Sequence, residues 1–189
     1  EHAGVWPTDL IGYSMGGRVA LHFAAAHPTK VRRLILESAS PGLGTEAERL
    51  ERKANDEALA CEIELHGVKD FIRRWESLPL FESQLQLPNP VRAKRHAQRL
   101  RNTEAGLASA LRGLGTGALP SLWEALPSIQ TRTLIIAGEL DTKFVEIGEQ
   151  MTAVLPQAQL LIVPGAGHTV HLERPRPWVE AVAEFIYST

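Results

Sequence analysis

The sequence predicts an α/β protein in which a parallel sheet is flanked by helices and interrupted by a helical insertion. Three observations point to this class. Short apolar runs alternate with helical patterns toward both ends of the chain, a glycine-rich turn joins the first apolar run to a helix, and a long middle stretch contains no convincing strand. Strands that alternate with helices favour a parallel sheet, because each helix returns the chain to the end where the previous strand began.

Four short segments are rich in leucine and β-branched residues, as strands covered on both faces should be. They are residues 8–11, 31–37, 133–137 and 160–163. Apolar residues at helical spacing predict helices at 18–27, 145–155 and 178–187. The first of these helices should end at His27, because the residue before a proline disfavours helical backbone angles.

The middle of the chain, from Thr45 to about Trp123, is rich in Arg, Glu, Ala and Leu and has a helical pattern throughout. Breaks rich in proline or glycine divide it at residues 78–79, 87–90 and 113–117. We therefore predict a core formed by residues 1–40 and 124–189, and an inserted helical cap formed by residues 41–123.

Composition narrows the functional classes. The chain has 20 basic and 22 acidic side chains, so no charge excess favours nucleic acid or an anionic membrane as partner. The single cysteine, Cys61, excludes an internal disulfide framework and a cysteine-rich metal site. No apolar run approaches the roughly 20 residues that cross a bilayer, and no signal peptide is visible, so we expect a cytoplasmic protein.

The segment from Gly12 through Ser14 to Gly16 fits the G-x-S-x-G nucleophile elbow, and it lies where that motif must lie, after a strand and before a helix. In such a turn the serine hydroxyl stands above the sheet, and small flanking residues let the helix pack closely. The Met15 backbone N–H would then point toward a developing oxyanion. The alternative is an ordinary glycine-rich turn that carries a surface serine.

A serine hydroxyl needs a histidine base and a carboxylate that orients the histidine. Asp141 directly follows a buried-looking strand and is the predicted acid, with Glu139 as its rival; either could instead cap the next helix. His168 lies in a glycine-rich loop after the last strand and is the predicted base, with His171 as its competitor. The two histidines fit no zinc motif, and no metal site is predicted.

With these residues assembled, the chain resembles the α/β-hydrolase superfamily and, more narrowly, the 2-succinyl-6-hydroxy-2,4-cyclohexadiene-1-carboxylate synthases of menaquinone biosynthesis. The resemblance extends over nearly the whole chain. Its motifs are residues 12–18, 37–43, 48–52 with Asp56, 138–144 and 167–173. The serine, aspartate and histidine motifs are shared by the superfamily, whereas Arg18, the arginine-rich start of the cap and the segment from Asp141 to Phe144 discriminate more finely.

The resemblance implies a lyase that eliminates pyruvate from 2-succinyl-5-enolpyruvyl-6-hydroxy-3-cyclohexene-1-carboxylate, a small-molecule carboxylate, without metal or organic cofactor. It assigns substrate binding to Arg18, Arg49, Arg101, Tyr13, Trp75 and Phe144. Arginines suit such a substrate, because guanidinium groups bind carboxylates in a bidentate manner. Arg49 and Arg101 could instead be solvated charges, and Arg52 or Arg99 could face inward in their place. Trp75 and Phe81 resemble pocket-wall residues of the family, but either could instead be a buried cap aromatic.

The chain departs from this family before the elbow. It begins with Glu1 and reaches its first predicted strand at Thr8, so we expect the strands and the oxyanion loop that precede the elbow in the family to be absent from it. We expect an exposed sheet edge, little activity of the chain alone, and self-association or pairing with the missing N-terminal segment. Two other functions remain open, a serine hydrolase acting on esters or carbon-carbon bonds and an inactive fragment.

Overall fold

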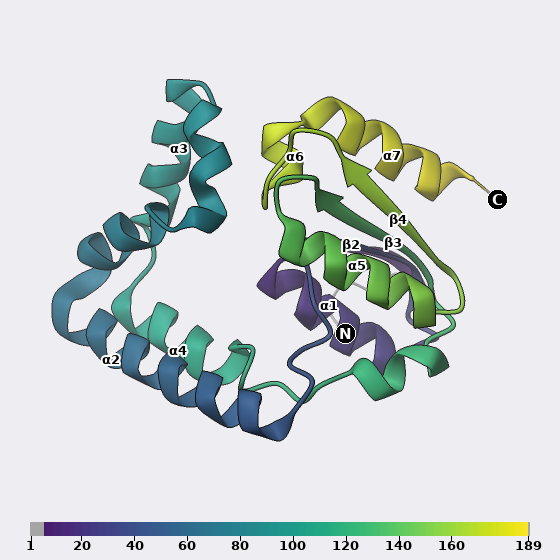
Figure 1. Ribbon diagram of the computed structural model, residues 1–189, viewed down its shortest axis with the longest axis horizontal. Helices are drawn as coiled ribbons and strands as arrows, with labels where there is room; N and C mark the ends of the chain where they lie inside the picture. The colour runs from purple at the N-terminus through teal and green to yellow at the C-terminus, as the bar shows by residue number, and fades with distance from the viewer. Residues whose placement is uncertain (1–5, 189) are drawn as a thin grey trace. The chain divides into compact units, whose positions relative to one another are not determined.

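The computed structural model describes residues 6–188, which form two compact units (Figure 1). The core unit contains the described residues up to Pro41 and those from Leu122 onward, and the cap unit contains Gly42–Ser121. The predicted cap, residues 41–123, begins one residue earlier and ends two residues later than this unit. The insertion leaves and rejoins the core at one place, because the Leu122 N–H donates to the Pro41 carbonyl at 2.8 Å.

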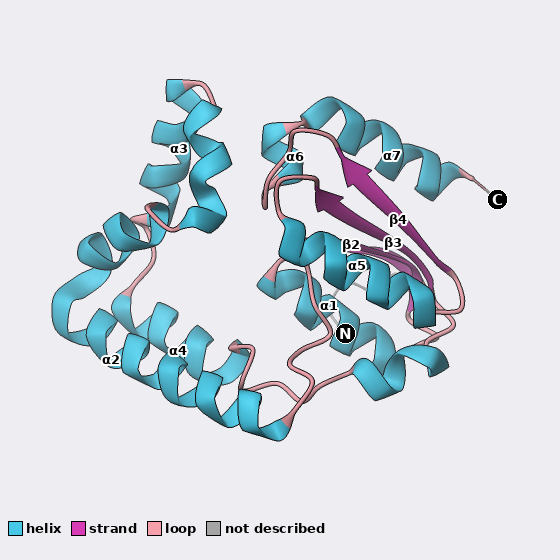
Figure 2. Ribbon diagram, in the orientation of Figure 1, coloured by secondary structure: helices cyan, strands magenta, loops and turns pink. Residues whose placement is uncertain are grey.

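The core unit is a sheet of parallel strands with helices on its faces (Figure 2). Its elements are β1 (Thr8–Tyr13), α1 (Met15–Ala26), β2 (Val31–Glu37), η2 (Trp123–Ser128), β3 (Arg132–Gly138), α5 (Thr142–Val154), β4 (Ala158–Val163), α6 (Val170–Glu173) and α7 (Pro175–Tyr187). The described strands pair in parallel in the order β1-β2-β3-β4. The predicted parallel sheet flanked by helices is confirmed.

Alternating apolar side chains explain why helices cover both faces of this sheet. In β2, Leu34 and Leu36 join the cluster that contains apolar residues of α1 and α5, whereas Ile35 joins the cluster that contains Val182 and Phe185 of α7. Successive residues of a strand point to opposite faces, so an unbroken apolar strand requires a cover on each side. The carboxyl ends of the strands are left at one edge of this layer, where the functional residues lie.

All three helices predicted for the core begin three residues earlier than their sequence patterns indicate, and the one expected from Val145 begins at Thr142. The helix expected from Arg18 begins at Met15, because Gly16 and Gly17 hide the helical pattern. Gly17 is required there, since a Cβ at this position would lie 2.5 Å from the Cβ of Ala39. The helix expected from Trp178 begins at Pro175, a position at which proline costs no hydrogen bond.

The cap unit is entirely helical in its secondary structure. Its elements are α2 (Glu46–Glu76), η1 (Pro79–Gln86), α3 (Asn89–Arg99) and α4 (Glu104–Leu114). A capping box starts α2, where the Thr45 hydroxyl accepts the Glu48 N–H at 3.2 Å and the Glu48 carboxylate accepts the Thr45 N–H at 2.9 Å. Ile63 and Phe71 of α2 pack with Leu107 of α4 in an apolar cluster of the cap's own. The predicted helical insertion is confirmed.

No helix among residues 6–188 is both long enough and apolar enough to cross a bilayer.

An ion pair ties the first two strands together at their start. Asp9 of β1 accepts hydrogen bonds from Nε and Nη2 of Arg32 in β2, at 2.8 and 2.6 Å. These bonds lower the pKa of Asp9, first through the Arg32 hydrogen bonds and then through the positive charges of Arg32 and Arg33, against an opposing effect of burial.

The Asp9 pair should make a pH-dependent contribution to stability. A carboxyl whose pKa is lower in the folded state stabilises that state above its unfolded pKa, about 3.9, and loses this contribution as the pH falls through the folded value. We expect Asp9→Asn to lower the urea midpoint at pH 7, and the difference from the parent to close as the pH falls below about 3. A difference that stays constant from pH 7 to pH 3 would contradict this role of the Asp9 charge.

Candidate active site

Ser14 lies in the turn between β1 and α1 with a backbone conformation that only a constrained residue adopts. Its φ is 50° and its ψ is −117°, in a region that non-glycine residues rarely occupy. The surroundings enforce this conformation. The Ser14 N–H donates to the Glu37 carbonyl at 2.8 Å, and a Cβ at Gly12 would lie 2.5 Å from the Cα of Gly17. The close approach of strand and helix therefore requires glycine on both sides of the serine.

The structure brings Ser14, His168 and Asp141 together in one hydrogen-bonded chain. His168 Nε2 lies 3.0 Å from Ser14 Oγ, and His168 Nδ1 lies 2.6 Å from Asp141 Oδ2. Because a carboxylate only accepts, Nδ1 carries the proton toward Asp141 and Nε2 can accept from the serine hydroxyl. His168 is 2% exposed and Asp141 7%, so water competes little for the bond between them.

Asp141 rather than its rival Glu139 contacts the imidazole. Both follow β3, but the Glu139 carboxylate turns toward the next loop and accepts the Gly165 N–H at 2.8 Å. Backbone bonds join the two loops as well, because the Glu139 N–H donates to Val163 and the Leu140 N–H to Ala166. The loop that carries the acid is thereby fixed to the loop that carries the base.

Glu173 holds the loop on both sides of His168. Its carboxylate accepts the Gly167 N–H at 2.7 Å and the Thr169 N–H at 3.0 Å, and the side chain is buried. Sequence reasoning placed Glu173 among the family motifs but gave it no role. An acid a few residues after a glycine-histidine pair was the available signal.

We expect Glu173→Gln to displace His168 as well as to destabilise the core unit. The amide offers one oxygen where the carboxylate offers two, so one buried N–H loses its acceptor, at a cost of about 1–3 kcal/mol. The resonance of the His168 Nδ1 proton should shift or broaden in the NMR spectrum. Glu180→Gln, the same exchange on an exposed side chain of α7, is the matched control. Equal His168 signals in both variants would contradict a positioning role for Glu173.

His171, the competing histidine, belongs to a different buried cluster. Its Nδ1 lies 2.8 and 2.9 Å from the two carboxylate oxygens of Glu37, which is 1% exposed. The Trp178 indole N–H donates to the same carboxylate at 2.8 Å. Glu37 was not predicted as a site residue, although an acid that ends an apolar strand was a visible signal.

Aromatic rings surround the His168 imidazole. Its centroid lies 5.4 Å from that of Tyr13 and 4.8 Å from that of Phe144, both predicted substrate-binding residues. The Tyr13 hydroxyl also shares a 3.0 Å hydrogen bond with Thr169. Met15, predicted to supply an oxyanion N–H, is the first residue of α1, so its N–H is among those that have no acceptor within the helix.

The predicted substrate arginines differ in their surroundings. Arg18 is in the core unit, one turn into α1, where its N–H donates to the Ser14 carbonyl at 3.1 Å and its side chain is buried. Arg49 and Arg101 belong to the cap unit; Arg49 is partly buried and Arg101 is exposed. Trp75, also in the cap, packs its ring between those of Phe71 and Phe81, at 5.5 Å from each.

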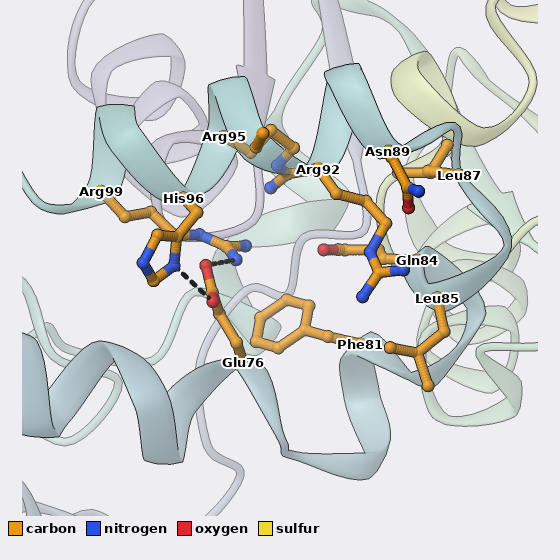
Figure 3. Close-up of a pocket in the computed structure, with 11 residues that line it drawn as sticks. Glu76, Phe81, Gln84, Leu85, Leu87, Asn89, Arg92, Arg95, His96 and Arg99 are labelled. Atoms are coloured by element: carbon orange, nitrogen blue, oxygen red, sulfur yellow. Dashed lines mark hydrogen bonds and ion pairs between the residues drawn. The ribbon is translucent and has the colours of Figure 1, made fainter.

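The cap unit contains a pocket of about 440 Å³ that the sequence did not predict (Figure 3). It lies between α3 and the segment that ends α2 and forms η1. Arg49, Arg101 and Trp75 are not among its lining residues. The basic side chains at this pocket come instead from α3 and are Arg92, Arg95, His96 and Arg99. Their spacing on one helical face, in a helix without acidic residues, was the signal that sequence reasoning missed.

A family model described as the alpha/beta hydrolase fold matches residues 1–175. The chain belongs to the α/β-hydrolase-fold family. Within this family, the structure of MenH from S. aureus superposes with a TM-score of 0.92 at 42% identity, over 94% of this chain and 67% of that one. The parallel sheet with a cap inserted after β2 is thus the arrangement of a known α/β hydrolase.

Two similar proteins carry the name of one synthase. A Bacillus subtilis protein, provisionally named 2-succinyl-6-hydroxy-2,4-cyclohexadiene-1-carboxylate synthase, is 47% identical over 95% of this chain and 65% of its own length. The Klebsiella pneumoniae protein with that synthase name is 32% identical over 95% of this chain and 68% of its own. The chain thus spans about two thirds of the length of these α/β-hydrolase relatives.

Within the described part of the chain, no group of three or more His, Cys, Asp or Glu side chains is arranged to hold a metal ion.

Proposed function

We propose that the chain carries the catalytic residues of a lyase that eliminates pyruvate from 2-succinyl-5-enolpyruvyl-6-hydroxy-3-cyclohexene-1-carboxylate. The observation that carries the proposal is the hydrogen-bonded chain from Ser14 through His168 to Asp141, with distances of 3.0 and 2.6 Å. The names of the similar proteins support the choice of substrate. We assign the three residues as a catalytic triad.

In this proposal Ser14 acts as a base rather than as a covalent nucleophile. His168 accepts the Ser14 hydroxyl proton, and Asp141 stabilises the imidazolium that forms. The serine oxygen takes the proton from the ring carbon that bears the succinyl group, and the electron pair moves onto the succinyl carbonyl oxygen. The Met15 N–H and the N-terminus of α1 stabilise this enolate.

Collapse of the enolate then breaks the bond between the ring and the enolpyruvyl oxygen. The electron pair returns through the ring, a new ring double bond forms, and enolpyruvate leaves and takes up a proton to become pyruvate. The protons balance, because Ser14 keeps the proton from the ring carbon, His168 gives up the proton that it took from Ser14, and enolpyruvate takes up one proton. No redox partner is required.

The substrate carries several carboxylates, and we assign their binding to arginines. Arg18 follows the elbow by one helical turn and is the candidate in the core unit, whereas Arg49 and Arg101 are the candidates in the cap. A bidentate guanidinium contact to a carboxylate is a strong charge-assisted interaction. Tyr13, Phe144 and Trp75 complete the assigned binding residues.

The test is release of pyruvate from the menaquinone intermediate, measured with lactate dehydrogenase. It is run on the 189-residue chain and on the chain joined to the N-terminal strands that the family resemblance predicts. Pyruvate release by the joined protein, lost in its Ser14→Ala variant, would support the proposal. Hydrolysis of simple esters without pyruvate release would replace it with the serine hydrolase alternative, and neither activity in a folded joined protein would support an inactive fragment.

A further inference from the structure

The pocket of the cap unit has a strong excess of positive charge. All of its lining residues lie between Glu76 and Arg99, within the cap. Three of them are arginines, and Glu76 is the single acid among them, which leaves an excess of two positive charges with His96 neutral. A concave site with such an excess concentrates anions.

The charges in the pocket are divided between two ends. Around Glu76, Arg99 Nη1 and His96 Nδ1 each lie 2.8 Å from a carboxylate oxygen. Burial alone would raise the pKa of Glu76, but the hydrogen bonds from Arg99 and His96 outweigh it and lower the pKa, so the carboxylate stays charged near neutral pH. This end of the pocket is internally neutralised.

The other end of the pocket is lined by Arg92 and Arg95 of α3 and by Gln84 of η1. In Figure 3, Arg92 extends from α3 toward Gln84. The spacing of Arg92, Arg95, His96 and Arg99 places them on one face of α3. Apolar atoms of Phe81, Leu85 and Leu87 line the pocket near them, and the Phe81 ring lies 5.3 Å from the Arg99 guanidinium carbon.

We propose that this pocket binds a small organic dicarboxylate, with Arg92 and Arg95 as its carboxylate ligands and the Phe81 wall against its carbon chain. The proposal deepens the proposed function, on which the choice of a carboxylate rests. Two guanidinium groups match two carboxylates in charge, and their planar donors suit bidentate contacts. The pocket volume of about 440 Å³ is within the range of small-molecule sites.

Succinate is the probe, and the test measures binding rather than turnover. The full 189-residue chain, labelled with ¹⁵N, is titrated with succinate at constant ionic strength. We expect saturable shifts confined to amides of η1 and α3. Arg92→Gln should weaken binding about tenfold or more, the usual effect of losing a charge-assisted hydrogen bond.

The matched control lies on the same helix. Lys94→Gln removes the same charge from an exposed position that does not line the pocket, and it should change the affinity by about twofold or less, because screening weakens distant surface charges. Circular dichroism checks that both variants fold. Equal weakening by both variants, or shifts without saturation, would overturn the proposal. Because the titration measures binding and not turnover, a failure of succinate to bind does not contradict the proposed triad. Likewise, an absence of pyruvate release does not contradict succinate binding in the cap pocket.

Discussion

Replacing Ser14 with alanine is expected to lower pyruvate release by about 10⁴–10⁶-fold, the loss typical of removing one member of an interdependent triad. The variant lacks the oxygen that His168 contacts at 3.0 Å, while the φ of 50° at this position is set by the surrounding turn and its tight strand-helix packing. The rate should therefore fall with little change in KM. Steady-state kinetics of the joined protein measure both constants.

The two neighbouring histidines provide the control for this result. His168→Gln should cause a loss similar to that of Ser14→Ala, and combining the two should add little, because the residues act as one unit. His171→Gln should cost much less, since His171 bonds to Glu37 rather than to Asp141. If His171→Gln is the more damaging change, the base has been assigned to the wrong histidine.

Gly138→Ala should produce the largest loss of stability among single methyl additions at the site. A Cβ at Gly138 would lie 2.2 Å from the Gly167 carbonyl oxygen and 2.4 Å from that of Ala166, both in the loop that carries His168. Backbone atoms cannot swing aside as the end of a side chain can, so the loop must shift. We expect a loss of about 2–3 kcal/mol in the free energy of unfolding.

Gly113→Ala is the matched control for this substitution. Gly113 is in α4, and nothing lies within 4 Å of a Cβ built there. Alanine favours an exposed helix over glycine by about 0.5–1 kcal/mol, so this variant should be slightly more stable. Urea denaturation of both proteins gives the two free energies. A Gly138→Ala protein as stable as the parent would show that the loops carrying Asp141 and His168 are not packed tightly against each other.

The sequence predicts the core well because its signals are local. Strand 31–37 matches β2 to the residue, since its apolar run has clear boundaries. The elbow was recognisable from its pattern and its place after a strand, but the close packing requires glycine at 12 and 17, whereas a Cβ at the predicted position 16 would meet nothing within 4 Å. Gly16 and Gly17 also concealed the true start of α1. Position after the strand singled out Asp141 among the aspartates but did not separate it from Glu139. The actual role of Glu139, accepting the Gly165 N–H, depends on a loop that lies far along the chain.

The cap was harder to predict because it depends on which helix face turns inward. Arginines occur throughout it, and the residues chosen from the family motifs, Arg49 and Arg101, do not line its pocket. Arg92 and Arg95 of α3 line it together with residues of η1, which precedes the break at residues 87–90. No pattern within one helix reveals such a pairing, and the same holds for the contact of Glu37 with His171.

The 2.8 Å bond between Leu122 and Pro41 gives the molecule a modular character. The cap residues that we propose as ligand-binding are encoded in one uninterrupted stretch whose two ends already meet, whereas the serine, acid and histidine are supported by strands on either side of that stretch. Insertions, deletions or replacement of the segment between Pro41 and Leu122 can therefore change ligand specificity without removing any hydrogen-bonded strand pair of the sheet. In such a design, new specificity and preserved chemistry can evolve on separate parts of the same chain.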